Sequence, residues 1–346
     1  MKKKTLAVLL TVAMAFSAIT GCSSSSNSSS SGSASGSASA SGSAAASADA
    51  SSVDFSGKTI NFYVTHATGG DTDYMARLLG QELEKELGCT VVCTNVTGSN
   101  GAICMTQYKD AVDKDGLTYI LTNTAALCGN EATGLADLGY DAFEPVAVYG
   151  KQSGENVVVK ADAPYDNLGD LIEASKNGSV NFGISTGGGV YIASVIMKEA
   201  GGANFNVIDA GDASARLTAL LGGHVDATIC PYSTIKDYIE SGELKTLGTL
   251  LKEAPDLLPD VPVCNDTIPE LVQNTEYVCL APKGTDSAYV KALNEAICNI
   301  GANSADWKEQ VNSYCFQEPY TLSVEDTIAD LKEQRENFMS FSQYLQ

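Results

Sequence analysis

Strand patterns and helix patterns alternate from about residue 56 to the end of the chain, and this alternation most constrains the fold. Strands are expected at residues 58–64, 89–93, 118–122, 146–148, 156–159, 180–184, 205–208, 225–229 and 277–281. Helices are expected at residues 75–83, 102–111, 168–175, 191–200, 213–221, 287–300 and 324–341. Such alternation is typical of an α/β fold with parallel sheets. The roughly 290 residues involved exceed the 100–200 of a typical domain, so we expect two lobes.

The first strand leads into a loop that contains a glycine pair. Ile60, Phe62 and Val64 share one face of that strand. The loop at residues 65–73 then offers glycines for a sharp turn and Asp or Thr side chains to cap the next helix. Because the first turn of a helix has free N–H groups, it attracts anions. The loop is therefore either an anion-binding site or a connection capped for stability alone.

A second loop of the same kind follows the strand at residues 180–184. Three glycines, residues 187–189, precede a predicted helix, and Ser185 and Thr186 add hydroxyl groups. Ligands of open α/β sheets bind beyond the carboxyl ends of the strands. One such loop in each lobe predicts a ligand cleft between the lobes. Neither loop contains the G-K-[ST] of a phosphate loop.

The second loop also matches the G-x-S-x-G pattern of serine hydrolases. Ser185 is its serine, and Asp209 or Asp212 and then His224 follow in the chain order of an α/β hydrolase. Against this alternative, three glycines separate Ser185 from the expected helix, and more than a hundred residues follow His224. We therefore expect no catalytic residues, with His66 lining a cleft or bonding locally.

Residues 1–21 have the features of a targeting segment. Three lysines precede an apolar run that is too short for a membrane-spanning helix of about 20 residues. The run ends in Ile-Thr-Gly-Cys, so the segment resembles a bacterial lipoprotein signal peptide with Cys22 as the lipidated residue. The Ser-, Gly- and Ala-rich residues 22–55 are expected to form a flexible tether. These features predict a lipid-anchored protein on the extracytoplasmic face of the cell membrane.

Charge and composition limit the kinds of molecule that the protein is expected to bind. The chain carries 21 Lys and Arg against 42 Asp and Glu, a net charge of −21, which disfavours nucleic acid. A local nest of N–H groups still allows an anionic ligand. Nine cysteines follow Cys22 without a disulfide framework, so we expect buried free thiols. His66 and His224 lie outside any metal-ligand spacing, so neither a metal nor a cofactor is expected.

Arginine is scarce in this chain. Arg77 and Arg216 lie in predicted helices, where we expect them to be solvated or ion-paired. A ligand carboxylate would then be held by backbone N–H groups and by Ser or Thr hydroxyls rather than by a bidentate arginine.

Several short motifs stand in order between residue 56 and the C-terminus. They are Gly69-Gly70-x-x-Asp73-x-x-Ala76-Arg77, Asn95-x-x-Gly98-x-x-Gly101, Asp115-Gly116-x-Thr118-Tyr119, Phe143-x-Pro145-Val146, Gly222-Gly223-x-Val225-Asp226, Leu258-Pro259-Asp260-Val261-Pro262 and Ala281-Pro282-x-Gly284-Thr285. In this order and spacing, the chain resembles the substrate-binding proteins of tripartite tricarboxylate transporters, the TctC or Bug family.

The resemblance implies a two-lobed, periplasmic-binding-protein-like α/β fold of type II. Each lobe would be a mixed sheet flanked by helices, with the ligand cleft between the lobes. Lobe 1 would combine residues 56–152 and 278–346, and lobe 2 would take residues 153–277. The resemblance further implies a monomer that captures a small carboxylate-bearing solute, such as a di- or tricarboxylate. It would deliver this solute to a permease with one large and one small membrane subunit.

The family's ligand-contacting loops correspond here to residues 65–73 and 185–191. The predicted ligand-binding residues are Thr65, His66, Thr68, Gly69, Gly70, Asp73, Asn123, Thr124, Ser185, Thr186, Gly187, Gly189, Tyr191 and Asp209. Tyr191 and Tyr232 are candidate walls of the cleft, with ordinary packing as the alternative for both.

The chain departs from the family pattern near the predicted site. Val96-Thr97 stands in place of Arg-Pro, Ile192 or Ala193 in place of a histidine, and Asp209 in place of a tyrosine. An acid at this position favours a ligand with an ammonium group, such as an amino acid, unless it is a surface carboxylate. A sensory protein that presents its ligand to a receptor is the other alternative to transport.

Overall fold

The computed structural model describes residues 53–110, 115–255 and 257–345. They fall within one unit, Ala50–Gln346. The predicted signal peptide, Cys22 and nearly all of the predicted tether lie outside the described residues. No helix in the described ranges is long and apolar enough to cross a membrane.

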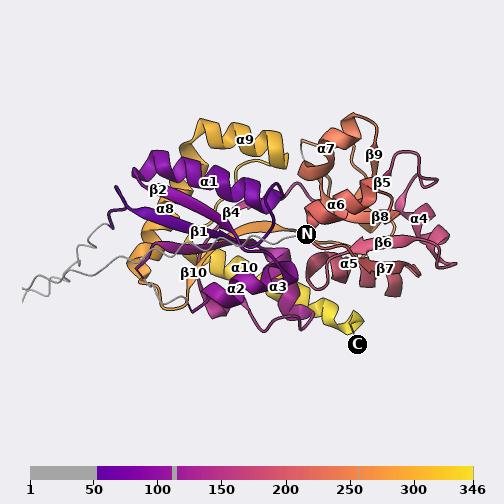
Figure 1. The fold of residues 1–346 in the computed structure, drawn as a ribbon, viewed down its shortest axis with the longest axis horizontal. Coiled ribbons are helices and arrows are strands. Elements are labelled where there is room, and N and C mark those ends of the chain that lie inside the picture. The colour runs from indigo at the N-terminus through magenta and orange to yellow at the C-terminus, as the bar shows by residue number, and fades with distance from the viewer. Residues whose placement is uncertain (1–52, 111–114, 256, 346) are drawn as a thin grey trace, which may run out of the picture. The chain divides into compact units, whose positions relative to one another are not determined.

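Two five-stranded sheets form the centres of two lobes (Figure 1). The first sheet has the order β2 (Thr90–Asn95), β1 (Thr59–Val64), β3 (Thr118–Asn123), β10 (Glu276–Pro282) and β4 (Phe143–Lys151). The second has the order β7 (Asn206–Asp209), β6 (Asn181–Ile184), β8 (Ala227–Pro231), β5 (Glu155–Lys160) and β9 (Leu244–Thr249).

Both sheets are mixed, and they repeat one pattern. In the first, β1 is parallel to β2 and β3, whereas β10 is antiparallel to β3 and β4. In the second, β6 is parallel to β7 and β8, whereas β5 is antiparallel to β8 and β9. The predicted mixed sheets are confirmed. Alternation alone predicted parallel sheets because it does not show that β5 and β10 each enter their sheet from the other lobe.

Helices flank each sheet. Beside the first are α1 (Asp71–Leu87), α2 (Ala102–Tyr108), α3 (Thr124–Ala132), α8 (Ser287–Asn303), α9 (Ala305–Cys315) and α10 (Val324–Ser340). Beside the second are α4 (Leu168–Ser175), α5 (Gly188–Glu199), α6 (Ala213–Leu221) and α7 (Tyr232–Glu240). Short 3-10 turns occur at η1 (Ser99–Gly101), η2 (Tyr140–Ala142), η3 (Cys264–Asp266) and η4 (Phe341–Tyr344).

The predicted elements agree with the observed ones where periodicity is strong. The bounds of α4 and α6 match the prediction, and Ile60, Phe62 and Val64 of β1 are fully buried as expected. The sequence did not predict α3, α7, α9 or β9. Helix α3 is buried on nearly all sides, so its residues show no amphipathic period. Helix α5 begins at Gly188, three residues earlier than predicted, so two of the three glycines belong to it.

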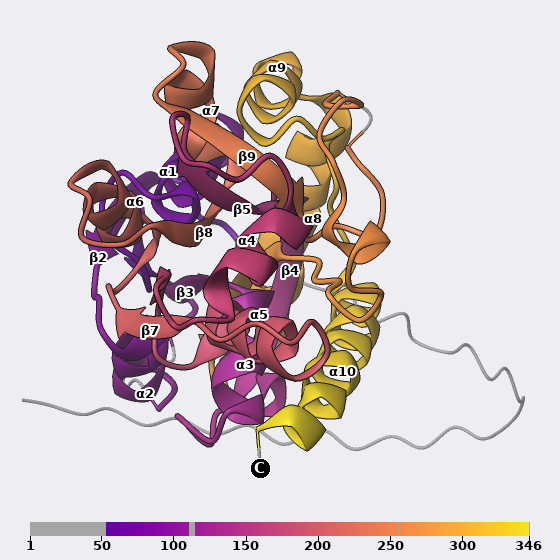
Figure 2. The same cartoon turned by 90° about the vertical axis from the view of Figure 1, so that its right-hand side faces the viewer.

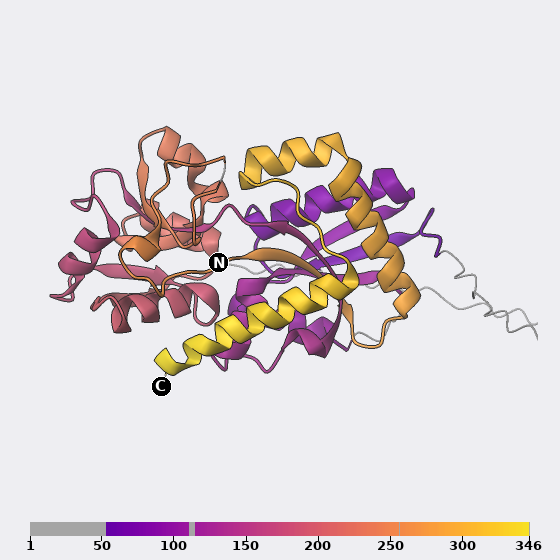
Figure 3. The ribbon, with the colours of Figure 1, turned by 180° about the vertical axis from the view of Figure 1, so that it is seen from behind.

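Two chain crossings join the lobes, at the β4–β5 connection and just before β10. The two crossings lie side by side, since the Gln152 N–H donates to the Thr275 carbonyl at 2.9 Å. Helix α3 also packs on α5, so closely that a Cβ on Gly129 would lie 2.6 Å from the Gly188 Cα (Figure 2). Figure 3 shows α10, in yellow, lying over the first sheet, and η4 after it contacts α5.

The nine cysteines of the described chain are free thiols, and seven of them are buried. Burial raises the pKa of the Cys104 and Cys128 thiols to about 12. They pack as small apolar side chains, as the sequence predicted.

Candidate functional site

A cavity of about 510 Å³ lies where strands of both sheets reach their carboxyl ends. Its lining residues come from the loops after β1, β2, β6 and β7, from the segment after α3 and from the start of α6. They are Thr65, His66, Thr97, Gly98, Ser99, Asn100, Gly101, Leu135, Ser185, Thr186, Asp209, Gly211, Asp212 and Ala215. The volume falls within the roughly 300–1,000 Å³ of small-molecule sites. The predicted cleft between the lobes is therefore present.

A smaller chamber of about 40 Å³ shares His66, Asn100 and Asp212 with this cavity. Its other lining residues are Asp71, Asn123, Ala125, Ala126, Gln152, Glu155, Gly189, Val190, Ala213 and Arg216. We call it the inner chamber. Three carboxylic acids, one arginine and one histidine line it, which is a dense set of ionisable groups for so small a space.

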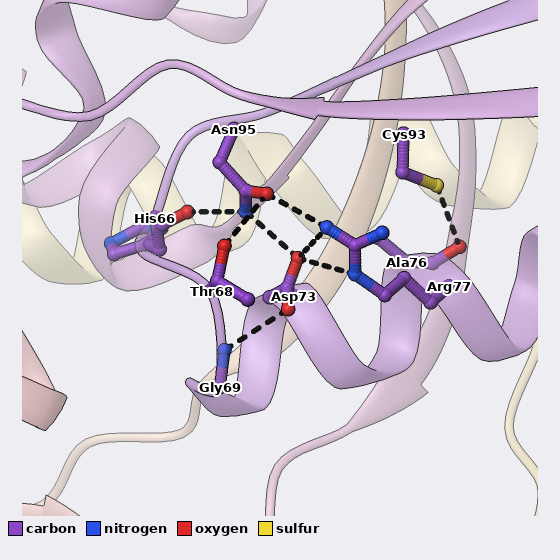
Figure 4. A network of polar contacts seen from close by, with 8 residues as sticks. All are labelled: His66, Thr68, Gly69, Asp73, Ala76, Arg77, Cys93 and Asn95. Carbon is purple, nitrogen blue, oxygen red and sulfur yellow. Dashed lines mark hydrogen bonds and ion pairs between the residues drawn. The ribbon is translucent and has the colours of Figure 1, made fainter.

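A polar network around Asp73 fixes the first loop (Figure 4). The Asp73 carboxylate accepts hydrogen bonds from the Gly69 N–H at 3.0 Å, Arg77 Nε at 2.9 Å and Asn95 Nδ2 at 2.8 Å. Asn95 Nδ2 also donates to the His66 carbonyl at 2.8 Å. Burial acts to raise the pKa of Asp73, but the bonds from Arg77, Asn95 and Gly69 outweigh it and lower that pKa. We call Asp73 and the residues bonded around it, Thr68, Gly69, Arg77 and Asn95, the Asp73 network.

The start of α1 differs from the expected open anion site. Its N-cap is Gly70, which has no side chain to cap the helix, rather than an Asp or Thr. Asp71 and Asp73 occupy the first turn. These carboxylates already supply the negative charge that a helix N-terminus favours. Gly69 and Asp73 line a separate groove of about 590 Å³ beside α9, on the first lobe.

The start of α5 carries no acid in its first turn. Gly187 and Gly188 have φ angles of 77° and 67°, which residues with a Cβ rarely adopt. Gln273 Nε2 donates to the Gly189 carbonyl at 3.0 Å, and the Thr186 hydroxyl donates to the Asp209 carboxylate. Neighbouring residues therefore hold the second loop in place. Unlike α1, helix α5 has no carboxylate in its first turn to interact with the N–H groups there.

His66 stands where the cavity and the inner chamber meet. Its Nδ1 lies 2.8 Å from the Thr65 hydroxyl, which in turn lies 3.1 Å from Thr122 Oγ1. Burial lowers the pKa of His66, although the Asp71 and Asp212 carboxylates act to raise it. The imidazole is therefore neutral at neutral pH and can donate or accept one hydrogen bond to a ligand.

Arg216 of α6 is buried, with 4% of its surface exposed, rather than solvated as expected. Its Nε donates to the Ile229 carbonyl at 3.1 Å and its Nη1 to the Gly211 carbonyl at 2.9 Å. Among the described residues it forms no ion pair within 4 Å. The alternatives considered for this arginine, solvation or ion pairing, are both wrong, because the helix points its side chain toward the inner chamber.

Glu155 and Gln152 stand beside Arg216 in the wall of the inner chamber. Burial raises the pKa of Glu155 to about 7, with the nearby Asp71 charge adding to the rise and Arg216 opposing it. Gln152 Nε2 donates to Asp71 Oδ2 at 2.6 Å. In the described chain, Glu155 Oε2 and Gln152 Oε1 are buried without a hydrogen-bond partner.

The structure brings together about half of the predicted ligand-binding residues. Thr65, His66, Ser185, Thr186 and Asp209 line the cavity, and His66, Asn123 and Gly189 line the inner chamber.

The other predicted ligand-binding residues lie elsewhere. Thr68, Gly69 and Asp73 belong to the Asp73 network, and Gly70 is the N-cap of α1. Thr124 is buried and accepts the Glu276 N–H, and Gly187 faces Leu135. Tyr191 packs against the core, and Tyr232 packs edge-on against Phe316.

Sequence reasoning missed several lining residues. The main ones are residues 97–101, Asp71, Gln152, Glu155, Asp212 and Arg216. Gly98 and Gly101 belong to a sequence motif, but the motif does not show that they form part of the cavity wall. Glu155 and Arg216 gave no local signal, because only the fold brings β5 and α6 to the same point.

Ser185 lies in the cavity wall, but the expected hydrolase partner does not. His224 is exposed after the C-terminal end of α6, where its N–H donates to the Ala219 carbonyl at 2.8 Å, and it is not a lining residue. The described residues therefore do not place His224 beside Ser185.

Two mixed α/β lobes with a polar cavity at their junction define the class of extracytoplasmic solute-binding proteins. The model of one family, the tripartite tricarboxylate transporter family receptor (TctC), matches residues 75–337. The chain belongs to this family, as the sequence motifs predicted.

Known proteins share this chain's sequence or fold. The chain is 29% identical over 257 residues to the protein BugT of Bordetella pertussis (strain Tohama I), covering 71% of this chain and 77% of BugT. The structure of MatC from Rhodopseudomonas palustris with bound malate matches with a TM-score of 0.73 at 21% identity, covering 84% of this chain and 99% of MatC. Rpa4515 from R. palustris with adipate matches with a TM-score of 0.74 at 20% identity, covering 83% of this chain and 97% of Rpa4515. The predicted two-lobed fold is confirmed.

Proposed function

We propose that the protein captures a small carboxylate-bearing solute outside the cytoplasm and delivers it to the membrane subunits of a tripartite permease. The observation that carries this proposal is the cavity of about 510 Å³, whose wall combines loops from both lobes. Closing two lobes over a solute excludes water from its polar groups and strengthens their interactions with the protein.

The donors around the cavity support an anionic ligand. The loop at residues 97–101 contributes backbone N–H groups, and Ser185 contributes a hydroxyl that makes no hydrogen bond to another described residue. Such local donors can hold a carboxylate even on a chain with a net charge of −21. The structures of MatC with malate and Rpa4515 with adipate provide further support, since both ligands are dicarboxylates.

A thermal-shift screen of di- and tricarboxylates, followed by calorimetric titration, tests this proposal. We expect one class of acid to raise the melting temperature and to bind with one molecule per chain. Ser185→Val and Thr186→Val remove hydroxyls from the cavity wall and should weaken binding. Ser313→Ala, at an exposed position on α9 away from the cavity wall, serves as the control. If no small acid stabilised the protein, the proposal would be wrong.

We further propose that Cys22 is lipidated and holds a monomer at the extracytoplasmic face of the membrane. The support is the basic, apolar and Ile-Thr-Gly-Cys sequence at residues 1–22. Metabolic labelling with palmitate should mark the wild type and not Cys22→Ala. Transport of the bound acid by co-expressed large and small permease subunits would distinguish delivery from a sensory role.

The proposed action is binding without catalysis. A serine-directed fluorophosphonate provides the test, because Ser185 lies in the cavity wall. We expect the probe not to label Ser185, so the wild type and Ser185→Ala should give the same signal. Specific labelling of Ser185 together with turnover of an ester would instead establish a hydrolase.

A further inference from the structure

The inner chamber holds a positive charge that has no counter-ion within the described residues. The Arg216 guanidinium is 4% exposed, and only its Nε and Nη1 donate, both to backbone carbonyls. In that part of the chain, Nη2 makes no hydrogen bond and no carboxylate lies within 4 Å. A buried guanidinium with a free edge is well suited to bind a carboxylate.

The same chamber holds an excess of acceptors. Asp71 and Glu155 are 5% and 8% exposed, and Asp212 joins them in the wall. Glu155 Oε2 and Gln152 Oε1 are buried and accept no hydrogen bond from the described residues. Gln152 Nε2 donates to the Asp71 carboxylate, so its Oε1 is fixed as an acceptor.

A bound group must therefore bring donors as well as acceptors. Buried polar atoms are normally paired, and an ammonium group supplies three N–H donors and a positive charge. A metal ion fits less well, because in the described chain no set of three His, Cys, Asp or Glu side chains is arranged to hold one. Because the unpartnered acceptors and Arg216 line one chamber of about 40 Å³, the ligand's two charged groups must be close together.

We propose that the solute is an α-amino acid whose ammonium and carboxylate groups occupy the inner chamber, while its side chain extends into the larger cavity. The ammonium group donates to Glu155 and Gln152, and the carboxylate accepts from Arg216. His66, Asn100 and Asp212 line both the inner chamber and the larger cavity. They therefore lie where the ligand's side chain would leave the chamber. This inference rests on the proposed function and narrows its ligand class.

Calorimetric titration of the full-length protein with matched ligand pairs tests the inference. The pairs are L-aspartate with succinate, L-glutamate with glutarate, and 2-aminobutyrate with 4-aminobutyrate, within a panel of all common L-amino acids. At about pH 8, above the ordinary pKa of a carboxyl group, we expect the α-amino member of at least one pair to bind about tenfold or more tightly than its partner.

Three outcomes would overturn the inference and leave the proposed function intact. In the first, succinate and glutarate both bind at least as tightly as their aminated partners. In the second, added Na⁺ strengthens the binding of the non-aminated acids, which would place a metal cation in the chamber. In the third, 4-aminobutyrate binds as tightly as 2-aminobutyrate, so the two charged groups need not be adjacent. If no acid of either kind bound, the proposed function itself would fail.

Variants locate the ammonium group. Glu155→Gln and Asp212→Asn keep side-chain shape, and asparagine caps a helix as well as aspartate does, so α6 should remain folded. Glu155→Gln should cost about tenfold in amino-acid affinity and leave the affinity for the non-aminated partner unchanged or increased. Glu295→Gln, on the exposed face of α8, is the matched control and should change neither. Equal losses for both members of a pair would exclude an ammonium contact at Glu155.

Discussion

Asp73 and Glu155 are both buried carboxylic acids, but their surroundings differ. Asp73 accepts bonds from an arginine, an amide and a backbone N–H, and its pKa is lowered. Glu155 has a 3.5 Å contact with Gln152 and one unpartnered oxygen, and burial raises its pKa to about 7. The first carboxylate is satisfied by the protein's own donors, whereas the second keeps an unpartnered oxygen, which we propose accepts a ligand group.

The largest expected effect is on the pH dependence of stability. The folded-state pKa of Glu155, about 7, exceeds the unfolded value of about 4.3, so the folded protein holds an extra proton between these values. Its contribution is fully present below about pH 4 and is lost as the pH rises through 7, a total change of about 4 kcal/mol. Glu155→Gln should remove this loss, as urea unfolding at about pH 5 and pH 8 would measure.

The pKa of a second carboxyl group is also raised, and its effect must be distinguished from that of Glu155. Glu276, whose pKa burial raises to about 8, gives a change of the same sign in both proteins. The difference between the wild type and Glu155→Gln isolates Glu155. An identical pH dependence in the two proteins would show that Glu155 is paired in solution.

The next effect concerns the helix contact beside the inner chamber. Gly129→Ala puts a Cβ 2.6 Å from the Gly188 Cα, so α3 and α5 must separate. Overpacking of this kind should lower the free energy of unfolding by about 2 kcal/mol and weaken ligand binding. Gly70→Ala at the start of α1 is the control, because its nearest neighbour lies 3.3 Å away. If Gly70→Ala lowered the free energy of unfolding more than Gly129→Ala, the start of α1 would be packed more tightly than the α3–α5 contact, contrary to this prediction.

Asp73→Asn should act on stability and not on affinity. Loss of the charge weakens the bonds from Arg77 and Gly69, which we expect to cost about 1.5 kcal/mol at neutral pH. Because the pKa of Asp73 is lowered in the folded state, its contribution is present above the unfolded value and is lost as the pH falls through the folded value. The difference from the wild type should therefore shrink in acid. A large loss of ligand affinity at unchanged stability would show instead that Asp73 contacts the ligand.

The smallest effect is expected at Thr68. Its hydroxyl donates to Asn95 Oδ1 at 3.1 Å from an exposed position. Thr68→Val should lower the free energy of unfolding by about 0.5 kcal/mol, because an exposed hydrogen bond is readily replaced by water. Ligand affinity, measured by the same titration as above, should not change. A drop in affinity would show that the Asp73 network extends to the ligand.

The strands and helices with clear local periods were predictable from the sequence. Ile60, Phe62 and Val64 alternate because β1 has one buried face, and the bounds of α4 and α6 follow from their apolar spacing. Helix α3 was missed, since a helix buried on nearly every side loses the contrast that reveals it.

The candidate site was predictable in part. Thr65, His66, Ser185 and Thr186 follow strands that end at the cavity, so their chain position was enough to suggest them. Gly69 and Asp73 lie in the same kind of loop, yet the structure assigns them to the Asp73 network. The pattern of strand, glycine and helix does not show whether the carboxylates of the loop turn inward or outward.

The sequence by itself determined the α/β class, the family and the two glycine loops, because these depend on local periodicity and on motifs along the chain. The tertiary structure alone decided that Asp71, Glu155 and Arg216 meet, since they come from α1, β5 and α6. Hydrophobic packing of two sheets sets the distances between such residues. Burial then determines which of their charges stay unpaired and available to a ligand.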